Sequence, residues 1–182
     1  MDTYISMLRG VNVSGHRRVR MEELERLYLS LGCRNVRTYV QSGNVLFEHP
    51  TADISKLAGK IEKRLKGPLG SDVPVLIRTK NEFQRLIESN PFAERDESKV
   101  HVTFLYAKPM EFSMDKINKV VGRGEAFSMV GSEIYLFCPN GYGRTKLSNS
   151  FFERALKMTA TTRNWKTVNT LCSMARTSGP QK

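Results

Sequence analysis

Strand-like and helix-like segments alternate along the first 80 residues of the chain. Apolar residues at every second position predict strands, and apolar residues spaced three and four apart predict helices. The expected strands are 3–9, 36–41, 45–49 and 73–78, and the expected helices are 21–31 and 54–65. The order β-α-β-β-α-β is that of the split βαβ unit of ferredoxin-like folds.

A similar order begins again in the second half of the chain. Thr79 and Glu82 first form the capping box of a short connecting helix, which ends before Pro91. The expected elements after it are a strand at 99–107, a helix at 113–121, hairpin strands at 125–130 and 134–138, and helices at 147–157 and 163–174. The second copy is therefore expected to end in helices rather than in a fourth strand.

These patterns predict an α+β protein of two similar ferredoxin-like halves, with mainly antiparallel sheets and additional C-terminal helices. We expect the first half at 1–90 and a second, incomplete half at 91–176 that ends in two helices. A tail at 177–182 is expected to be disordered. At about 150 residues per domain, a chain of 182 residues fits one compact body that contains both halves.

The charge of the chain is unusual, whereas the rest of its composition is ordinary. There are 29 Lys and Arg against 18 Asp and Glu, which gives a net charge of +11. The segment 140–182 holds eight basic residues and one acidic residue, so it carries +7 of this excess. Such asymmetry favours an anionic partner, and the alternative is a solvated basic surface that serves solubility.

Cysteine usage and hydropathy indicate the compartment. Cys33, Cys138 and Cys172 form no C-x-x-C pair, so we expect reduced thiols and no metal site. No apolar run approaches the roughly 18 residues of a membrane span, so no membrane partner is expected. The first residues lack the order of a signal peptide, and the expected localisation is therefore cytoplasmic.

Four segments resemble the signatures of one bacterial family, domain of unknown function 1697 (DUF1697). They are Met7–Gly15, Thr38–Phe47, Gly141–Leu147 and Thr161–Val168. The usual motif has Gly-Gly where this chain has Ser14-Gly15, a departure that concerns only the turn of that loop. The resemblance implies an α+β fold, and it implies no activity, because the family is named for lacking a known one.

Polar residues gather where the first and third strands of the first half should meet. These candidate anion-binding residues are Arg9, Asn12, Gln41, Ser42 and Asn44. In a ferredoxin-like unit the first strand runs antiparallel to the third, so the end of one meets the start of the other. A guanidinium beside amides and a hydroxyl suits a phosphate or a carboxylate. In the alternative, Asn12 and Asn44 bind loop backbone groups and Arg9 pairs with a carboxylate.

A second set of candidates, Arg144, Lys146, Arg163 and Asn164, lies near the C-terminal end. The glycine-rich loop at 141–146 precedes a helix and can present backbone N–H groups to an anion, although its spacing is not that of a P-loop. Thr162 is expected to cap the last helix, which would place Arg163 against the helix dipole unless an anion offsets it. In the alternative the loop only turns the chain and Arg163 pairs with Glu153.

No catalytic constellation is recognisable, and we expect neither a cofactor nor a metal. The histidines at 16, 49 and 101 have no ligand spacing and no nucleophilic partner. The biochemical function is therefore unknown, and two hypotheses remain. The first is a basic anion-binding module, with RNA or DNA as the favoured polymer. The second is a small cofactor-independent enzyme that acts on a phosphorylated or carboxylated metabolite. The sequence predicts no oligomeric state.

Overall fold

The computed structural model describes residues 1–13, 18–110 and 114–177 of the chain. Two units are present: Met1–Gln84 together with Thr170–Lys182, and Arg85–Asn169. The expected boundary at residue 90 thus lies six residues after the observed one, and the C-terminal segment groups with the first unit. Of the expected disordered tail, 178–182 lie outside the described residues.

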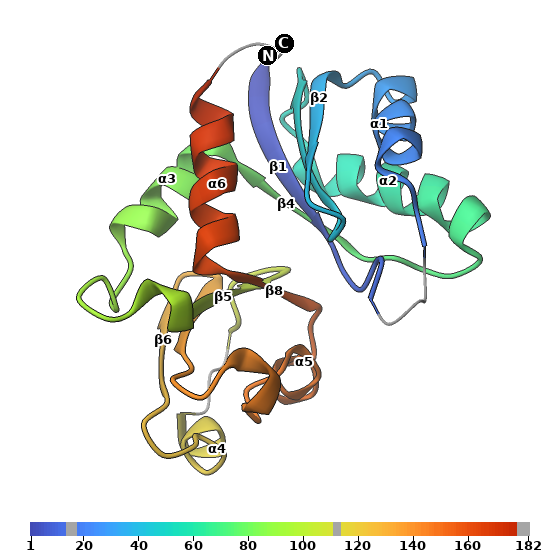
Figure 1. The fold of residues 1–182 in the computed structure, drawn as a ribbon. Helices are drawn as coiled ribbons and strands as arrows, with labels where there is room; N and C mark the ends of the chain where they lie inside the picture. Colours follow the sequence, from blue (N-terminus) through green and yellow to red (C-terminus); the bar gives the residue numbers. More distant parts are fainter. Residues whose placement is uncertain (14–17, 111–113, 178–182) are drawn as a thin grey trace. The chain divides into compact units, whose positions relative to one another are not determined.

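The first unit holds a four-stranded antiparallel sheet in the order β2-β3-β1-β4. Its strands are β1 (Asp2–Leu8), β2 (Arg34–Tyr39), β3 (Asn44–His49) and β4 (Val75–Thr79). Its helices α1 (Met21–Ser30) and α2 (Ile54–Leu69) cover the same face of the sheet (Figure 1). This strand order is that of the split βαβ unit expected from the sequence.

The core of the first unit lies between this sheet and its two helices. Alternate residues of β1 face the helices, with Ser6 bonded to Tyr28 of α1. The side chain of Asp53 accepts a hydrogen bond from the Lys56 N–H at 2.9 Å and so caps α2. The apolar face of α2 is buried in the core through Leu57, Ala58, Ile61 and Leu65. The opposite face of α2 is consequently exposed.

The second unit repeats this arrangement, with the strand order β6-β7-β5-β8. Its strands are β5 (Val100–Leu105), β6 (Ala126–Val130), β7 (Glu133–Phe137) and β8 (Ala160–Asn164). Its helices are α4 (Met114–Asn118), α5 (Asn149–Leu156) and the 3-10 turns η1 (Glu97–Lys99) and η2 (Tyr142–Arg144). All three strand pairs are antiparallel, so two similar α+β halves are confirmed.

The fourth strand of the second unit corrects the prediction for this segment. The expected helix over 163–174 begins only at Trp165, and β8 precedes it, with Thr162 opposite Thr103 of β5. The second copy is therefore complete in its strands. Thr161 and Thr162 are β-branched and favour extended backbone, and Ala160, Thr161 and Arg163 of β8 are buried. The polar composition of the strand gave no sign of this burial.

Two helices contain the boundaries between the units: α3 (Lys80–Glu88) and α6 (Trp165–Arg176). The predicted capping box starts α3, since Glu82 accepts from the Thr79 N–H at 2.7 Å and its own N–H donates to Thr79 Oγ1 at 3.1 Å. The end of α6 is held within the first unit by Arg37 of β2, whose Nη2 donates to the carbonyl of Met174 at 2.7 Å and to that of Thr177 at 3.2 Å.

Candidate functional site

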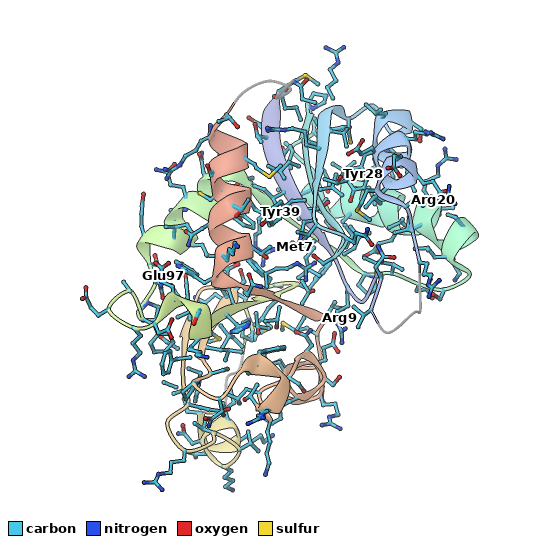
Figure 2. The ribbon with its side chains drawn as sticks, in the orientation of Figure 1. Met7, Arg9, Arg20, Tyr28, Tyr39 and Glu97 are labelled. Carbon is cyan, nitrogen blue, oxygen red and sulfur yellow. The ribbon has the colours of Figure 1, made fainter. Side chains whose placement is uncertain are left out.

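The structure brings the predicted polar residues of the first unit together at one edge of its sheet. Met7 pairs with Asn44 across β1 and β3, and the Leu8 N–H donates to the Gly43 carbonyl at 2.9 Å. The amide of Asn12 donates to the carbonyl of Gln41 at 2.8 Å. Arg9, labelled in Figure 2, follows directly after β1, and its backbone N–H donates to the Pro74 carbonyl at 2.9 Å.

The amides of Asn12 and Asn44 make hydrogen bonds within this loop region. Asn12 has a φ of 55°, and its Oδ1 accepts from the Val19 N–H at 3.0 Å while its Nδ2 donates to the Val19 carbonyl at 3.0 Å. Asn44 is fully buried, and its Nδ2 donates to the Tyr39 carbonyl at 3.1 Å and to Ser42 Oγ at 2.8 Å. These bonds agree with the alternative in which Asn12 and Asn44 bind backbone groups of the loops. An anion-binding role for this edge stays a prediction.

A cleft of about 720 Å³ opens beside this edge, at the start of α1. Its lining residues are Asn12, Arg18, Val19, Arg20, Met21, Glu22, Glu23 and Gln41. Arg20, labelled in Figure 2, is the N-cap residue of α1 and makes no side-chain capping bond. Two arginines and two glutamates line the cleft, so the formal charges of its described lining residues balance. The cleft is polar, and it is not a cationic pocket.

In the second unit, the glycine-rich loop is separated from the helix that follows it. Residues 142–144 form η2, the Leu147 N–H is bonded to Thr145 Oγ1, and α5 starts only at Asn149 with Ser148 as its cap. The backbone donors of the loop therefore do not form the start of α5, which the sequence predicted at Leu147. Arg144 and Lys146 are both exposed, and they keep their candidate role as surface cations.

Arg163 lies in β8 and not at a helix start, which corrects the prediction made for it. Its side chain is 9% exposed, and its Nη1 donates to Thr161 Oγ1 at 2.8 Å and to the Thr162 carbonyl at 2.9 Å. Asn164 instead caps α6, because its Oδ1 accepts from the Thr167 N–H at 2.8 Å. The predicted cap residue Thr162 has another role, and no unfavourable dipole is left for an anion to offset at Arg163.

Thr162 is the centre of a hydroxyl network that uses the polar groups around it. Thr162 Oγ1 donates to Asn149 Oδ1 at 2.6 Å, because an amide oxygen only accepts. It lies 3.1 Å from the hydroxyl of Tyr142 and 2.7 Å from that of Thr103. Since a hydroxyl has one proton, both of these neighbours donate to Thr162. The network is internally satisfied, and its hydroxyls are structural.

Most titratable groups with displaced pKa values are buried and uncharged near neutral pH. The exception is the exposed carboxyl of Asp96, whose pKa is lowered by its hydrogen bonds with Ser98 and which stays charged. Burial raises the pKa of the Cys33 and Cys138 thiols to about 11, which disfavours a nucleophilic thiolate. Burial also raises the pKa of Tyr28 and Tyr135 and lowers that of His101. None of these groups lines the cleft. Within the described ranges, no group of His, Cys, Asp or Glu side chains could hold a metal ion.

A further set of candidates, which we call the basic face of α2, is not among the predicted residues. It consists of Lys56, Lys60, Lys63, Arg64 and Lys66, all of them exposed. Lys66 pairs with Asp72 at 3.0 Å, and Arg64 donates to Ser30 Oγ at 3.2 Å. The helix has one acidic residue, Glu62, whose Oε1 accepts from the Val75 N–H of β4 at 2.8 Å. All the exposed charged residues of α2 itself are therefore cations.

A sequence signal for the basic face of α2 did exist. Lys56, Lys60 and Lys63 recur at i, i+4 and i+7, which places them in one stripe of a helix. The apolar residues of the same helix have the complementary spacing, so the stripe had to face outward. The segment 140–182, with its net charge of +7, does not include these residues. By unit, the first carries 16 Lys and Arg with 9 Asp and Glu (+7), and the second 13 with 9 (+4).

Comparison with known proteins identifies a family and a fold. The chain is similar to a solved structure, a conserved bacterial protein, SP0830, from Streptococcus pneumoniae, with a TM-score of 0.73 and 22% identity over 96% of this chain and 99% of that one. No curated protein matches the chain significantly. No helix among the described residues is long and apolar enough to cross a membrane. The family model of DUF1697, proteins of unknown function, matches residues 1–135, and the chain therefore belongs to this family.

Proposed function

We propose that this protein is a basic anion-binding module and that the basic face of α2 is its binding surface. One observation carries the proposal: five exposed cations share one side of a helix whose single acidic residue is bonded elsewhere. Cations gathered on one surface raise the local concentration of anions and their association rate. The net charge of +7 on the first unit acts in the same direction.

Binding is favoured over catalysis by the chemistry of the candidate sites. A general acid or base needs a pKa near the working pH. Among the described residues, the displaced pKa values lie on buried groups that stay neutral and on the exposed Asp96, whose pKa moves farther from neutrality. The enzyme hypothesis needs a cavity for a small metabolite, and the cleft beside α1 is the candidate for it. Its two arginines and two glutamates give it no excess of positive charge, so it supports the enzyme hypothesis less well.

The proposal is tested with long-chain inorganic polyphosphate, a polyanion without bases or sugars. We expect the parent protein to bind it and Lys56→Gln/Lys60→Gln/Lys63→Gln to lose at least about tenfold in affinity at low salt. The matched control is Lys108→Gln/Lys116→Gln/Lys119→Gln, which removes three exposed lysines of the second unit. Isothermal titration calorimetry gives both affinities.

Two other variants locate the site if α2 is not responsible. Arg144→Gln/Lys146→Gln tests the glycine-rich loop, and Arg18→Gln/Arg20→Gln tests the cleft. Equal losses in the α2 variant and its control would show that only net charge matters. A loss confined to the loop or the cleft variant would move the binding surface there and overturn the assignment to α2.

A further inference from the structure

We propose that the polyanion on the basic face of α2 is double-stranded nucleic acid, bound through its phosphates and without regard to base sequence. This inference rests on the proposed function and names the ligand of that same surface. Its support comes from the spacing of the lysines, the relief of the helix face, and the residue types that the face lacks.

The lysines form a line and do not converge on one point. With a rise of 1.5 Å per residue, Lys60 lies about 6 Å from Lys56 along the helix axis, and Lys63 lies about 4.5 Å farther. The three cations together span about 10.5 Å along the axis, which is much longer than one phosphate group. Along one strand of a duplex a charge recurs about every 3.4 Å of the axis, so a strand lying along α2 can present a separate phosphate to each lysine. The spacing therefore fits a polymer of phosphates.

The basic face of α2 has low relief between its cations. Gly59 and Gly67 both lie on the exposed side, and among the described residues a Cβ added to either would have no atom within 4 Å outside its own stretch of helix. A glycine inside a helix is destabilising relative to alanine, and contacts with the rest of the described structure do not require either glycine. Without side chains at these positions, the helix backbone can approach a flat or convex ligand closely.

The residue types on α2 favour a duplex over a single strand. Single-stranded nucleic acids are held by aromatic side chains on which their bases stack. The segment 54–69 contains no Phe, Tyr or Trp. Four of the five cations are lysines, which act as point charges on phosphates and read no base edges by themselves. Contacts of this kind position a duplex without selecting its sequence.

The packing of α2 argues against an anionic membrane as the partner. A helix that binds a membrane surface buries its own apolar face among the lipids. The apolar face of α2 is already used, because Leu57, Ile61 and Leu65 are buried in the core of the first unit. The exposed residues left for contact are the five cations, the two glycines, Ser55 and Pro68.

The experiment measures fluorescence anisotropy with a labelled duplex of about 16 base pairs and the single strands from which it is made. We expect the parent protein to bind duplexes of unrelated sequence equally and to prefer them to the single strands. The slope of log affinity against log salt is negative, and its magnitude should decrease by about three in Lys56→Gln/Lys60→Gln/Lys63→Gln, because three phosphate contacts are lost. It should be unchanged in Lys108→Gln/Lys116→Gln/Lys119→Gln.

A variant of the helix face tests the contact without changing any charge. Gly59→Leu favours the helix, so the fold should be retained, which circular dichroism checks. The bulky side chain should hold the duplex away from Lys56 and Lys60 and lower the affinity at least about fivefold. Gly59→Ala should bind nearly as the parent does. Equal binding by all three proteins would contradict a close approach to α2.

The outcomes separate this inference from the proposed function. Polyphosphate binding through α2 without duplex binding overturns the inference and leaves the anion-binding module standing. A preference for single strands, or binding to vesicles with anionic phospholipid but not to duplex, overturns it as well. Failure to bind both polyphosphate and duplex overturns the two proposals together.

Discussion

The two units place a buried hydroxyl at the same position of their central strand and satisfy it in different ways. Ser6 of β1 lies opposite Val45 and Ile77, and Thr103 of β5 lies opposite Ile134 and Thr162. Both side chains are completely buried. The hydroxyl of Ser6 bonds to Tyr28 of α1 at 2.7 Å, whereas that of Thr103 bonds sideways to the neighbouring strand.

The length of the covering helices explains this difference. In the first unit, α1 has 10 residues and brings a tyrosine over the sheet, but its counterpart α4 in the second unit has only 5 residues. Thr103 therefore depends on β8, and Thr162 in turn draws in Tyr142 and Asn149. In two units of the same strand topology, the buried hydroxyl of the central strand is thus satisfied by a helix residue in one and by a hydroxyl network in the other.

The helices after the third strand differ in a second respect. The 16-residue α2 has five exposed cations, and the 8-residue α5 has one cation, Arg154. Both helices bury an apolar face, so the difference is confined to the outward face. The strand topology therefore does not set the surface chemistry, and the first unit alone presents a long cationic helix among the described residues.

The largest effect on stability is expected from glycine substitutions in the turns before β3 and β7. Gly43 has a φ of +71°, and an added Cβ would lie 2.4 Å from Val11 Cγ2 and 2.8 Å from Leu8 Cβ. Gly131, in the turn before β7, has a φ of +64°, with its nearest neighbour at 3.7 Å. We expect Gly43→Ala to lower the free energy of unfolding by about 2–5 kcal/mol and Gly131→Ala by about 1–2 kcal/mol. Urea denaturation measures both, and equal losses would show that crowding is irrelevant.

A smaller effect should separate the two ways of satisfying the buried hydroxyl. Thr162→Val leaves three polar groups without their partner, and we expect a loss of about 2–3 kcal/mol. Tyr28→Phe leaves Ser6 its weak bond to the Val45 carbonyl at 3.4 Å, and we expect about 1 kcal/mol. Thr162→Ser keeps the hydroxyl and should recover most of the loss. A larger loss of stability in Tyr28→Phe than in Thr162→Val would show that the hydroxyl network stabilises its unit less than the Ser6–Tyr28 bond stabilises the other.

The smallest expected effect concerns pH and distinguishes His101 from Tyr4, its counterpart in the first unit. Burial lowers the pKa of His101 from its usual 6.5, so the unfolded chain takes up a proton more readily. Its contribution to stability is complete above pH 6.5 and is lost as the pH falls towards the folded pKa. The pKa of Tyr4 is raised, mainly by burial, so Tyr4 stays neutral throughout this range.

Replacing His101 should therefore flatten the acid limb of the stability curve. We expect His101→Gln to reduce the drop in melting temperature between about pH 7.5 and about pH 5. The ring also stacks on Tyr142, with centroids 4.9 Å apart, so a uniform loss of stability at all pH values is expected in addition. An unchanged slope would assign the acid sensitivity to other groups.

Much of the fold follows from local patterns, and the exceptions have a physical cause. The capping box at Thr79 and the cap at Asp53 depend on residues three apart, and both are present as expected. The strand β8 was missed because its stability comes from pairing with β5, about 60 residues earlier in the chain. Its sequence, Ala-Thr-Thr-Arg-Asn, has no apolar alternation that would favour a strand over a capped helix.

The candidate sites also divide into features that depend on local sequence spacing and features that depend on distant contacts. Strand topology was enough to place Asn12 beside Gln41, but not to show that the Asn12 amide is bonded to Val19. That bond depends on the path of a long loop, which local spacing does not determine. The stripe of Lys56, Lys60 and Lys63 is a local pattern and was visible, yet a sum of charge over long segments averages such a pattern away.

The hydrogen bonds between Arg37 of β2 and the end of α6 have a consequence for synthesis on the ribosome. The carbonyls of Met174 and Thr177 belong to the first unit, but they are translated only after every residue of the second unit. Units usually fold in the order in which they emerge. Here the first unit has all four strands of its sheet by Thr79, but the segment from Thr170 that completes it is made last. A nascent chain arrested before residue 170 thus holds its earlier-made unit incomplete and its later-made unit complete.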